Sequence, residues 1–126
     1  MSSPADLLYS ASHEWHKVQG DTCTVGITRY AVDALTDVTY VNTKPVGTKV
    51  APGGIVGEVE SVKTTSDVYS AAGGEIVEVN KALVDNPALL NTDPYANWLV
   101  KLKITDRSGL DKLSNADAYD KANPAH

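Results

Sequence analysis

Few side chains in this sequence could do covalent chemistry, and the setting of Lys63 is the most unusual among them. Lys63 lies in the run GEVESVKTTSDVYS, with small and polar neighbours, between two segments of alternating residues. The alternation predicts two strands joined by a tight turn at Val62-Lys63-Thr64. Because burying an unpaired ammonium is costly, the Lys63 side chain is expected to point into solvent at the tip of this hairpin.

Three roles are open to a lysine in this position. It could be an ordinary solvated side chain. It could be a Schiff-base nucleophile, but that role needs an apolar pocket or a nearby cation, whereas three carboxylates close in sequence favour the protonated amine. These carboxylates are Glu58, Glu60 and Asp67. It could also be a covalent attachment point, because a protruding turn is accessible to a modifying enzyme and a paired β scaffold beneath it would support a swinging arm.

The other reactive side chains limit the reactions that this chain could support. The chain has one cysteine, Cys23, which excludes an internal disulfide, a CxxC redox pair and a cysteine zinc site. Cys23 lies in the alternating run DTCTVGI, which predicts a small side chain packed inward. Two-electron thiol chemistry would therefore need sulfur atoms from outside the polypeptide. His16 and His126 have no partner at metal-ligand spacing, so no metal site is expected.

Composition and charge exclude several functional classes. The 126 residues are enough for one domain, and 42% hydrophobic with 21% charged residues is the balance of a globular protein. A net charge of -5 without a Lys/Arg cluster argues against nucleic-acid binding. No apolar run approaches the roughly 18–20 residues of a membrane span. The first sixteen residues contain no Lys or Arg, so neither a secretory signal nor a transit peptide is expected in this chain.

Periodicity and turn residues predict the surrounding elements. Thr28 is expected to cap a short helix with Tyr30, Ala31, Ala34 and Leu35 on one face. The clearest strand runs from Asn97 to Thr105, with Trp98, Val100, Leu102 and Ile104 on one face. Further strands are expected at 13–17, 22–27 and 38–41, a helical turn from Asn86-Pro87 through Leu90, and weak helix from about 109 to 122.

An internal repeat surrounds the lysine turn. The segment GGIVGEV at 53–59 resembles GGEIVEV at 73–79, and Gly53, Gly54, Glu58 and Val59 recur twenty positions later. Chance similarity between two β-rich segments remains an alternative, because Gly and Val are common there. Two matching strand units on either side of a short connection favour a structure with approximate internal symmetry, in which Lys63 lies in the connecting hairpin.

The run GEVESVKTTSDVYSAAGGEIVEVN resembles the lipoyl-attachment segment of the glycine cleavage system H protein family. The resemblance extends over nearly the whole chain, through separate motifs in the same order: Ser12-His13-Glu14-Trp15, Thr24-Val25-Gly26-Ile27-Thr28, Asp85-Asn86-Pro87, Asp93-Pro94-Tyr95 and Trp98-Leu99-Val100-Lys101. It implies a mostly β barrel-sandwich hybrid with short flanking helices, formed by residues 1–126 as a single lipoyl-carrier domain. The lipoyl hairpin would span about 53–80, and a C-terminal helical segment about 109–122.

The resemblance also implies a cofactor and partners. Lys63 would carry lipoate in amide linkage, and the chain would be a carrier rather than an enzyme. Its partners would be a pyridoxal-phosphate glycine decarboxylase, a tetrahydrofolate-dependent aminomethyltransferase, dihydrolipoyl dehydrogenase and a lipoate-attaching enzyme. An alternative within the family is an H-like protein that relays lipoyl groups to other proteins, which would need the same lysine. A third hypothesis, from another class, is an enzyme that uses Lys63 as a nucleophile.

Further roles follow from the resemblance residue by residue. Ser12, Glu14 and Asp67 would face the loaded amine in a surface cleft, where a carboxylate would pair with the protonated amine. Glu60 would help the lipoate-attaching enzyme recognise the hairpin, with a solvated strand glutamate as the alternative. His13 would be structural. We expect a monomer in a bacterial-type cytoplasm, or in the mitochondrial matrix after removal of a transit peptide.

Overall fold

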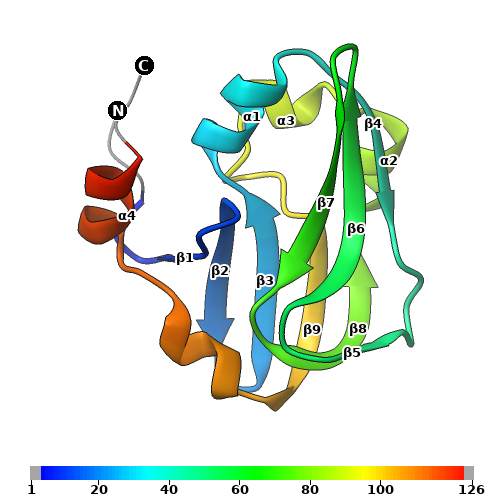
Figure 1. Cartoon of the computed structure of the whole chain (residues 1–126). Helices are drawn as coiled ribbons and strands as arrows, with labels where there is room; N and C mark the ends of the chain where they lie inside the picture. Colours follow the sequence, from blue (N-terminus) through cyan, green and yellow to red (C-terminus); the bar gives the residue numbers. More distant parts are fainter. Residues whose placement is uncertain (1–3, 124–126) are drawn as a thin grey trace.

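Two antiparallel sheets pack face to face in the structure, a computed structural model that describes residues 4–123 (Figure 1). The larger sheet has the strand order β1-β2-β3-β9-β8-β5, and the smaller has the order β4-β6-β7. The strands are β1 (Leu8–Tyr9), β2 (Glu14–Gln19), β3 (Thr22–Ile27), β4 (Val38–Thr43), β5 (Lys49–Val50), β6 (Gly54–Ser61), β7 (Thr65–Ser70), β8 (Gly73–Val79) and β9 (Val100–Asp106). The two repeat segments thus become β6 and β8, one in each sheet.

Short helices lie around the edges of the two sheets (Figure 1). They are α1 (Arg29–Leu35), α2 (Lys81–Asp85), α3 (Leu89–Thr92), the 3-10 helix η1 (Ser108–Lys112) and α4 (Ala116–Ala122). The expected cap of the first helix is confirmed, because the Thr28 side chain accepts a hydrogen bond from the Ala31 N–H. Within residues 4–123, no helix is both long enough and apolar enough to cross a membrane.

The main core fills the space between the two sheets. Its members come from both sheets and from α1, α2 and α3, and they are mostly Val and Leu, as a chain without phenylalanine requires. Cys23 is fully buried among them, which confirms the inward orientation expected from the sequence. A second cluster forms under α4 from Leu7, Tyr9, Trp15, Ala116 and Tyr119. Burying these side chains provides most of the stabilisation that holds the hairpin scaffold together.

Trp15 in the second cluster depends on a glycine in the neighbouring strand. Trp15 and Gly26 are direct cross-strand partners in β2 and β3. A Cβ atom at Gly26 would lie 2.4 Å from the indole ring, so only glycine leaves room for it. The indole N–H donates to the Pro94 carbonyl oxygen at 3.0 Å, which satisfies the polar atom of this buried ring.

The helix predictions were partly wrong. In α1 the buried side chains are Val32 and Leu35, and Ala34 is exposed. The helix has only seven residues, and only one pair of positions spaced i, i+3 faces the core. Asn86-Pro87 does not start a helix: Pro87 lies in a turn, and α3 begins at Leu89. Helix α2 was not predicted.

The predicted strands are present, but several begin or end at other residues than expected. The final strand begins at Val100 rather than at Asn97, because the backbone before it forms a turn and a bend, although Val100 and Leu102 do point into the core. The two-residue strands β1 and β5 were not predicted, since two residues cannot show alternation. The overall expectation, a mostly β fold with short flanking helices, is confirmed.

Candidate functional site: the lysine hairpin and the Glu14 pocket

Lys63 lies in the turn between β6 and β7, which projects beyond the ends of the neighbouring strands (Figure 1). The Ser61 side chain orders this turn, because its Oγ accepts hydrogen bonds from the Lys63 N–H at 3.2 Å and the Thr64 N–H at 3.3 Å. The Lys63 side chain is exposed, and its ammonium forms no salt bridge within residues 4–123. Exposure at a hairpin tip was the sequence-based prediction and is confirmed, and an exposed amine does not have the apolar, desolvated setting that a Schiff-base role would need.

Glu60 is tied to the opposite strand of the hairpin. It is the cross-strand partner of Thr65, whose hydroxyl donates to the Glu60 carboxylate at 3.1 Å. Glu60 therefore has a structural contact at the base of the lysine turn, while its side chain remains partly accessible. A role in recognition by a lipoate-attaching enzyme stays a prediction.

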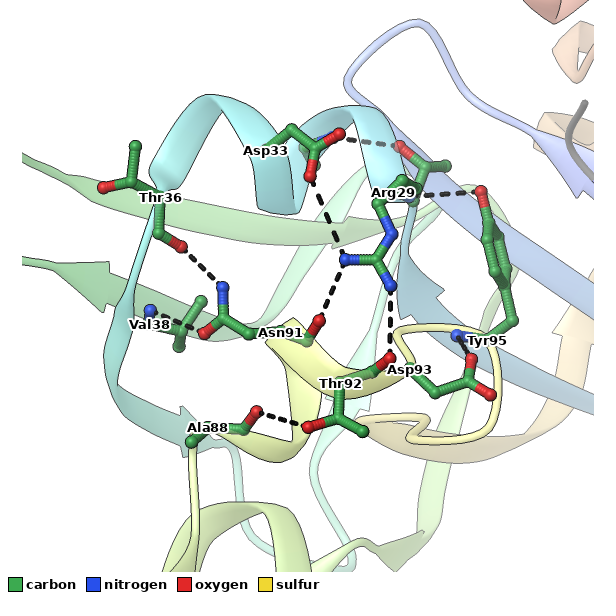
Figure 2. A network of polar contacts seen from close by, with 11 residues as sticks. Arg29, Asp33, Thr36, Val38, Ala88, Asn91, Thr92, Asp93 and Tyr95 are labelled. Atoms are coloured by element: carbon green, nitrogen blue, oxygen red, sulfur yellow. Dashed lines mark hydrogen bonds and ion pairs between the residues drawn. The ribbon is translucent and has the colours of Figure 1, made fainter. Parts of the chain in front are cut away.

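A polar network between α1 and α3 holds the start of β4, the strand that pairs with β6 next to the lysine turn (Figure 2). The Asn91 carboxamide oxygen accepts from the Val38 N–H at 2.9 Å, and its NH2 group donates to the Thr36 carbonyl oxygen at 2.7 Å. Val38 is the β4 partner of Ser61, the last strand residue before the lysine turn. Asn91 therefore fixes the strand that supports the turn.

Arg29 holds Asn91 and its helix in place. Its guanidinium donates to the carbonyl oxygens of Asn91 at 3.0 Å and Thr92 at 3.3 Å, while its own backbone N–H donates to the Tyr95 hydroxyl at 3.1 Å (Figure 2). Nothing in the local sequence pattern indicated this network, because its members are about sixty residues apart in the chain.

Ser12 and Glu14 meet in a second polar site at the start of β2. Glu14 is only 1% exposed, yet its carboxylate oxygen Oε1 accepts hydrogen bonds from the hydroxyls of Ser12 at 2.5 Å and Ser10 at 2.6 Å. Burial raises the pKa of the Glu14 carboxyl, and hydrogen bonds from Ser10, Ser12 and the backbone of Tyr69 oppose part of this rise. Ser10 and Tyr69 were missed by sequence reasoning, although the alternating Ser10-x-Ser12-x-Glu14 spacing was a signal.

Asp67 lies apart from this pair. Its side chain is exposed and lines a shallow hollow over the outer face of the smaller sheet, together with Asn42, Thr43, Lys44, Ile55, Gly57 and Glu58. No hydrogen bond joins Asp67 to Ser12 or Glu14 within residues 4–123. Tyr69, two residues from Asp67 in β7, contacts the Glu14 carboxylate through its backbone.

The histidines have structural surroundings. The ring nitrogen Nδ1 of His13 is 2.7 Å from the Tyr119 hydroxyl, and the His13 ring packs against Tyr30 with centroids 4.6 Å apart. His16 is fully buried, and its Nε2 accepts from the Ala71 N–H at 3.1 Å. His126 lies outside the described residues. Among residues 4–123, no group of three or more His, Cys, Asp or Glu side chains is placed to hold a metal ion.

Comparison with known proteins agrees with this architecture. Residues 7–125 match the family model described as "Glycine cleavage H-protein". A glycine cleavage system H protein from Thermus thermophilus is 51% identical over 120 residues, covering 94% of each chain. One from Alcanivorax borkumensis is 51% identical over 117 residues, covering 92% of this chain and 91% of the relative. The crystal structure of such a protein from Mycobacterium marinum superposes with a TM-score of 0.89 at 43% identity, covering 98% of this chain and all of the other.

The two open sheets, the projecting hairpin and the exposed lysine define a barrel-sandwich carrier domain of the lipoyl type. The chain belongs to the glycine cleavage H-protein family. It is a carrier protein, not an enzyme.

Proposed function

We propose that Lys63 is the attachment residue for lipoate, joined through an amide bond to Nζ. The observation that carries the proposal is an exposed lysine in a projecting hairpin of a chain that belongs to the H-protein family. The residues present fit the group: the amine is free of ion pairs among the described residues, and the adjacent turn residues Val62 and Thr64 leave it accessible. When bound, lipoate would supply the two sulfur atoms that the buried Cys23 cannot offer.

The chain would carry the aminomethyl group of glycine between three enzymes of the glycine cleavage system. A pyridoxal-phosphate glycine decarboxylase would load it, a tetrahydrofolate-dependent aminomethyltransferase would unload it, and dihydrolipoyl dehydrogenase would reoxidise the carrier. The hairpin contributes a fixed base for the arm, because β6 is paired on both sides by β4 and β7. Glu60 would contribute to recognition by the lipoate-attaching enzyme through its accessible carboxylate.

Ser12, Glu14 and Asp67 would shelter the loaded amine from water. Glu14 has the chemistry for this task, because a desolvated carboxylate pairs strongly with a protonated amine. Its contacts with Ser10 and Ser12 fix the position of the carboxylate. Asp67 is exposed on β7 and would approach the amine from the side of the hairpin.

We further propose a monomer of one lipoyl-carrier domain over residues 1–126, acting in a bacterial-type cytoplasm. The relatives from Thermus and Alcanivorax support a bacterial setting. A monomer suits a carrier whose single arm must reach several different enzymes in turn.

Intact mass of the chain co-expressed with a lipoate-attaching enzyme tests the proposal. The wild type should gain the mass of one lipoyl group, and Lys63→Arg should gain none, because a guanidinium does not form this amide. Lys44→Arg is the matched control, since it makes the same change at another exposed lysine of the smaller-sheet region. A full lipoyl increment on Lys63→Arg would refute the attachment site.

Reconstituted glycine decarboxylation with the partner enzymes then tests the carrier role. The lipoylated wild type should support glycine-dependent turnover. A fully lipoylated chain that remains inactive in this assay, but passes its lipoyl group to another acceptor protein, would replace aminomethyl transport with lipoyl relay.

A further inference from the structure

Tyr119 on α4 reaches the turn that presents Ser12 and Glu14. It is 4% exposed, and its ring stacks on Tyr9 with centroids 4.7 Å apart and 19° between the planes. Its hydroxyl lies 2.7 Å from Nδ1 of His13. It also lies 2.8 Å from Oγ1 of Thr28. Helix α4 thus contacts the turn through Tyr119, which is more than a hundred residues away in sequence.

His13 occupies a backbone conformation that needs support. Its φ is 72°, in the left-handed region that side chains other than glycine rarely adopt. Such conformations persist where the surroundings over-determine them. Here the His13 N–H donates to the Ser10 carbonyl oxygen at 3.1 Å, and the His13 carbonyl oxygen accepts from the Thr28 N–H at 3.0 Å. The ring is held separately, between Tyr30 and Tyr119.

The contacts of Thr28, Tyr119 and His13 form one hydrogen-bonded chain. Thr28 accepts from the Ala31 N–H and is hydrogen-bonded to the Tyr119 hydroxyl, which is in turn hydrogen-bonded to Nδ1 of a neutral His13. Burial lowers the pKa of His13 and raises the pKa of Tyr119 to about 12, so both groups are neutral near neutral pH. The contact between Tyr119 and His13 is therefore a hydrogen bond between neutral groups.

The conformation of His13 decides where its neighbours point. Ser12 and Glu14 flank His13 directly, and the Ser12 hydroxyl donates to the carboxylate oxygen Oε1 of Glu14. If φ of His13 returned to the common negative region, the chain direction between Ser12 and Glu14 would change, and their contact would be lost.

We propose that Tyr119 is a positioning residue for the carrier site: through His13 it holds Ser12 and Glu14 in the geometry that shelters the loaded amine. The inference rests on the proposed function of Ser12 and Glu14. It assigns to α4 a role in supporting a turn that is distant from it in the sequence.

Tyr119→Phe tests this role, with Tyr9→Phe as the matched control. Each change removes one hydroxyl from the same stacked pair, but the Tyr9 hydroxyl donates to the Pro4 carbonyl oxygen instead of to the turn. In lipoylated, aminomethyl-loaded protein, Tyr119→Phe should shorten the lifetime of the loaded arm by about fivefold, the factor for one lost hydrogen bond, and Tyr9→Phe should leave it unchanged. Equal lifetimes for the two variants would overturn the inference.

A readout that does not use the cofactor accompanies this assay. The three-bond coupling between the amide and α protons of His13, measured by NMR in the unmodified chain, reports its φ. It should change in Tyr119→Phe and remain as in the wild type in Tyr9→Phe. An unchanged coupling in Tyr119→Phe would also overturn the inference.

A different variant, Glu14→Gln, tests the proposed sheltering role separately from the role of Tyr119. Glu14→Gln should shorten the lifetime of the loaded arm if the carboxylate shelters the amine. If Glu14→Gln has the wild-type lifetime, the sheltering role is wrong, and the positioning role of Tyr119 is wrong with it. If Glu14→Gln shortens the lifetime and Tyr119→Phe does not, only the inference about Tyr119 is overturned.

Discussion

His16 gives the folded protein a specific dependence on pH. Its ring is fully buried, and burial lowers its pKa from the usual 6.5 to about 4. The backbone of Leu8 and of Glu14 opposes part of this lowering of the pKa. Because Nε2 accepts from the Ala71 N–H, protonation of that nitrogen would also place two donors against each other. The folded state therefore resists protonation of this side chain.

The sign and size of the effect follow from linkage. The unfolded chain binds the proton first as the pH falls, since its pKa is higher, so stability is full above pH 6.5 and is lost progressively toward pH 4. With pKa values of about 4 and 6.5, going from about pH 7 to about pH 5 removes about 2 kcal/mol from the free energy of unfolding. Two other groups titrate nearby: His13, with a lowered pKa, adds to the loss, and Glu14, with a raised pKa, opposes it.

Urea unfolding of the wild type and His16→Gln at both pH values isolates the contribution of His16. Glutamine does not titrate, and its side-chain oxygen can accept from the Ala71 N–H. His13 and Glu14 are present in both proteins, so their effects cancel in the difference. The loss of stability between the two pH values should be smaller in His16→Gln by about 2 kcal/mol. Equal losses in the two proteins would show that His16 is protonated as easily in the folded state as in the unfolded one.

Three further predictions concern the scaffold. Gly26→Ala should lower the free energy of unfolding by about 1–3 kcal/mol, because its Cβ would overlap the Trp15 ring; an unchanged urea midpoint would contradict that close contact. Ser61→Ala should speed hydrogen exchange at the Lys63 amide while costing no more than about 1 kcal/mol, since one exposed acceptor is lost; exchange at the wild-type rate would show that Ser61 does not order the turn. Cys23, whose pKa burial raises to about 12, should react with a thiol reagent only after denaturation; rapid labelling of the native protein would refute its burial.

The lysine turn was predictable because its signals are local. Alternating residues on both sides and small polar residues at the tip indicate a hairpin, and a single cation among them indicates exposure. The same holds for the Thr28 cap, where one side chain satisfies a backbone group three residues away. These features need no knowledge of the rest of the chain.

The surroundings of β2 were not predictable from alternation. Glu14, Trp15 and His16 are consecutive and all buried, although an alternating strand exposes every second residue. The strand is covered on both faces: Trp15 packs in the cluster under α4, and Glu14 and His16 meet the backbone of Tyr69 and Ala71. Burial on the second face depends on contacts between distant segments, which the local pattern cannot report.

Cys23 holds the only thiol of the chain inside the core between the sheets. A cyclic disulfide on a mobile arm is open to attack by any thiolate within its reach, and the product is a mixed disulfide that ties the arm to whatever attacked it. On a carrier with a surface cysteine, that attacker would be the carrier itself. Because the Cys23 sulfhydryl is buried, the lipoyl arm proposed for Lys63 would not be captured by the protein that carries it.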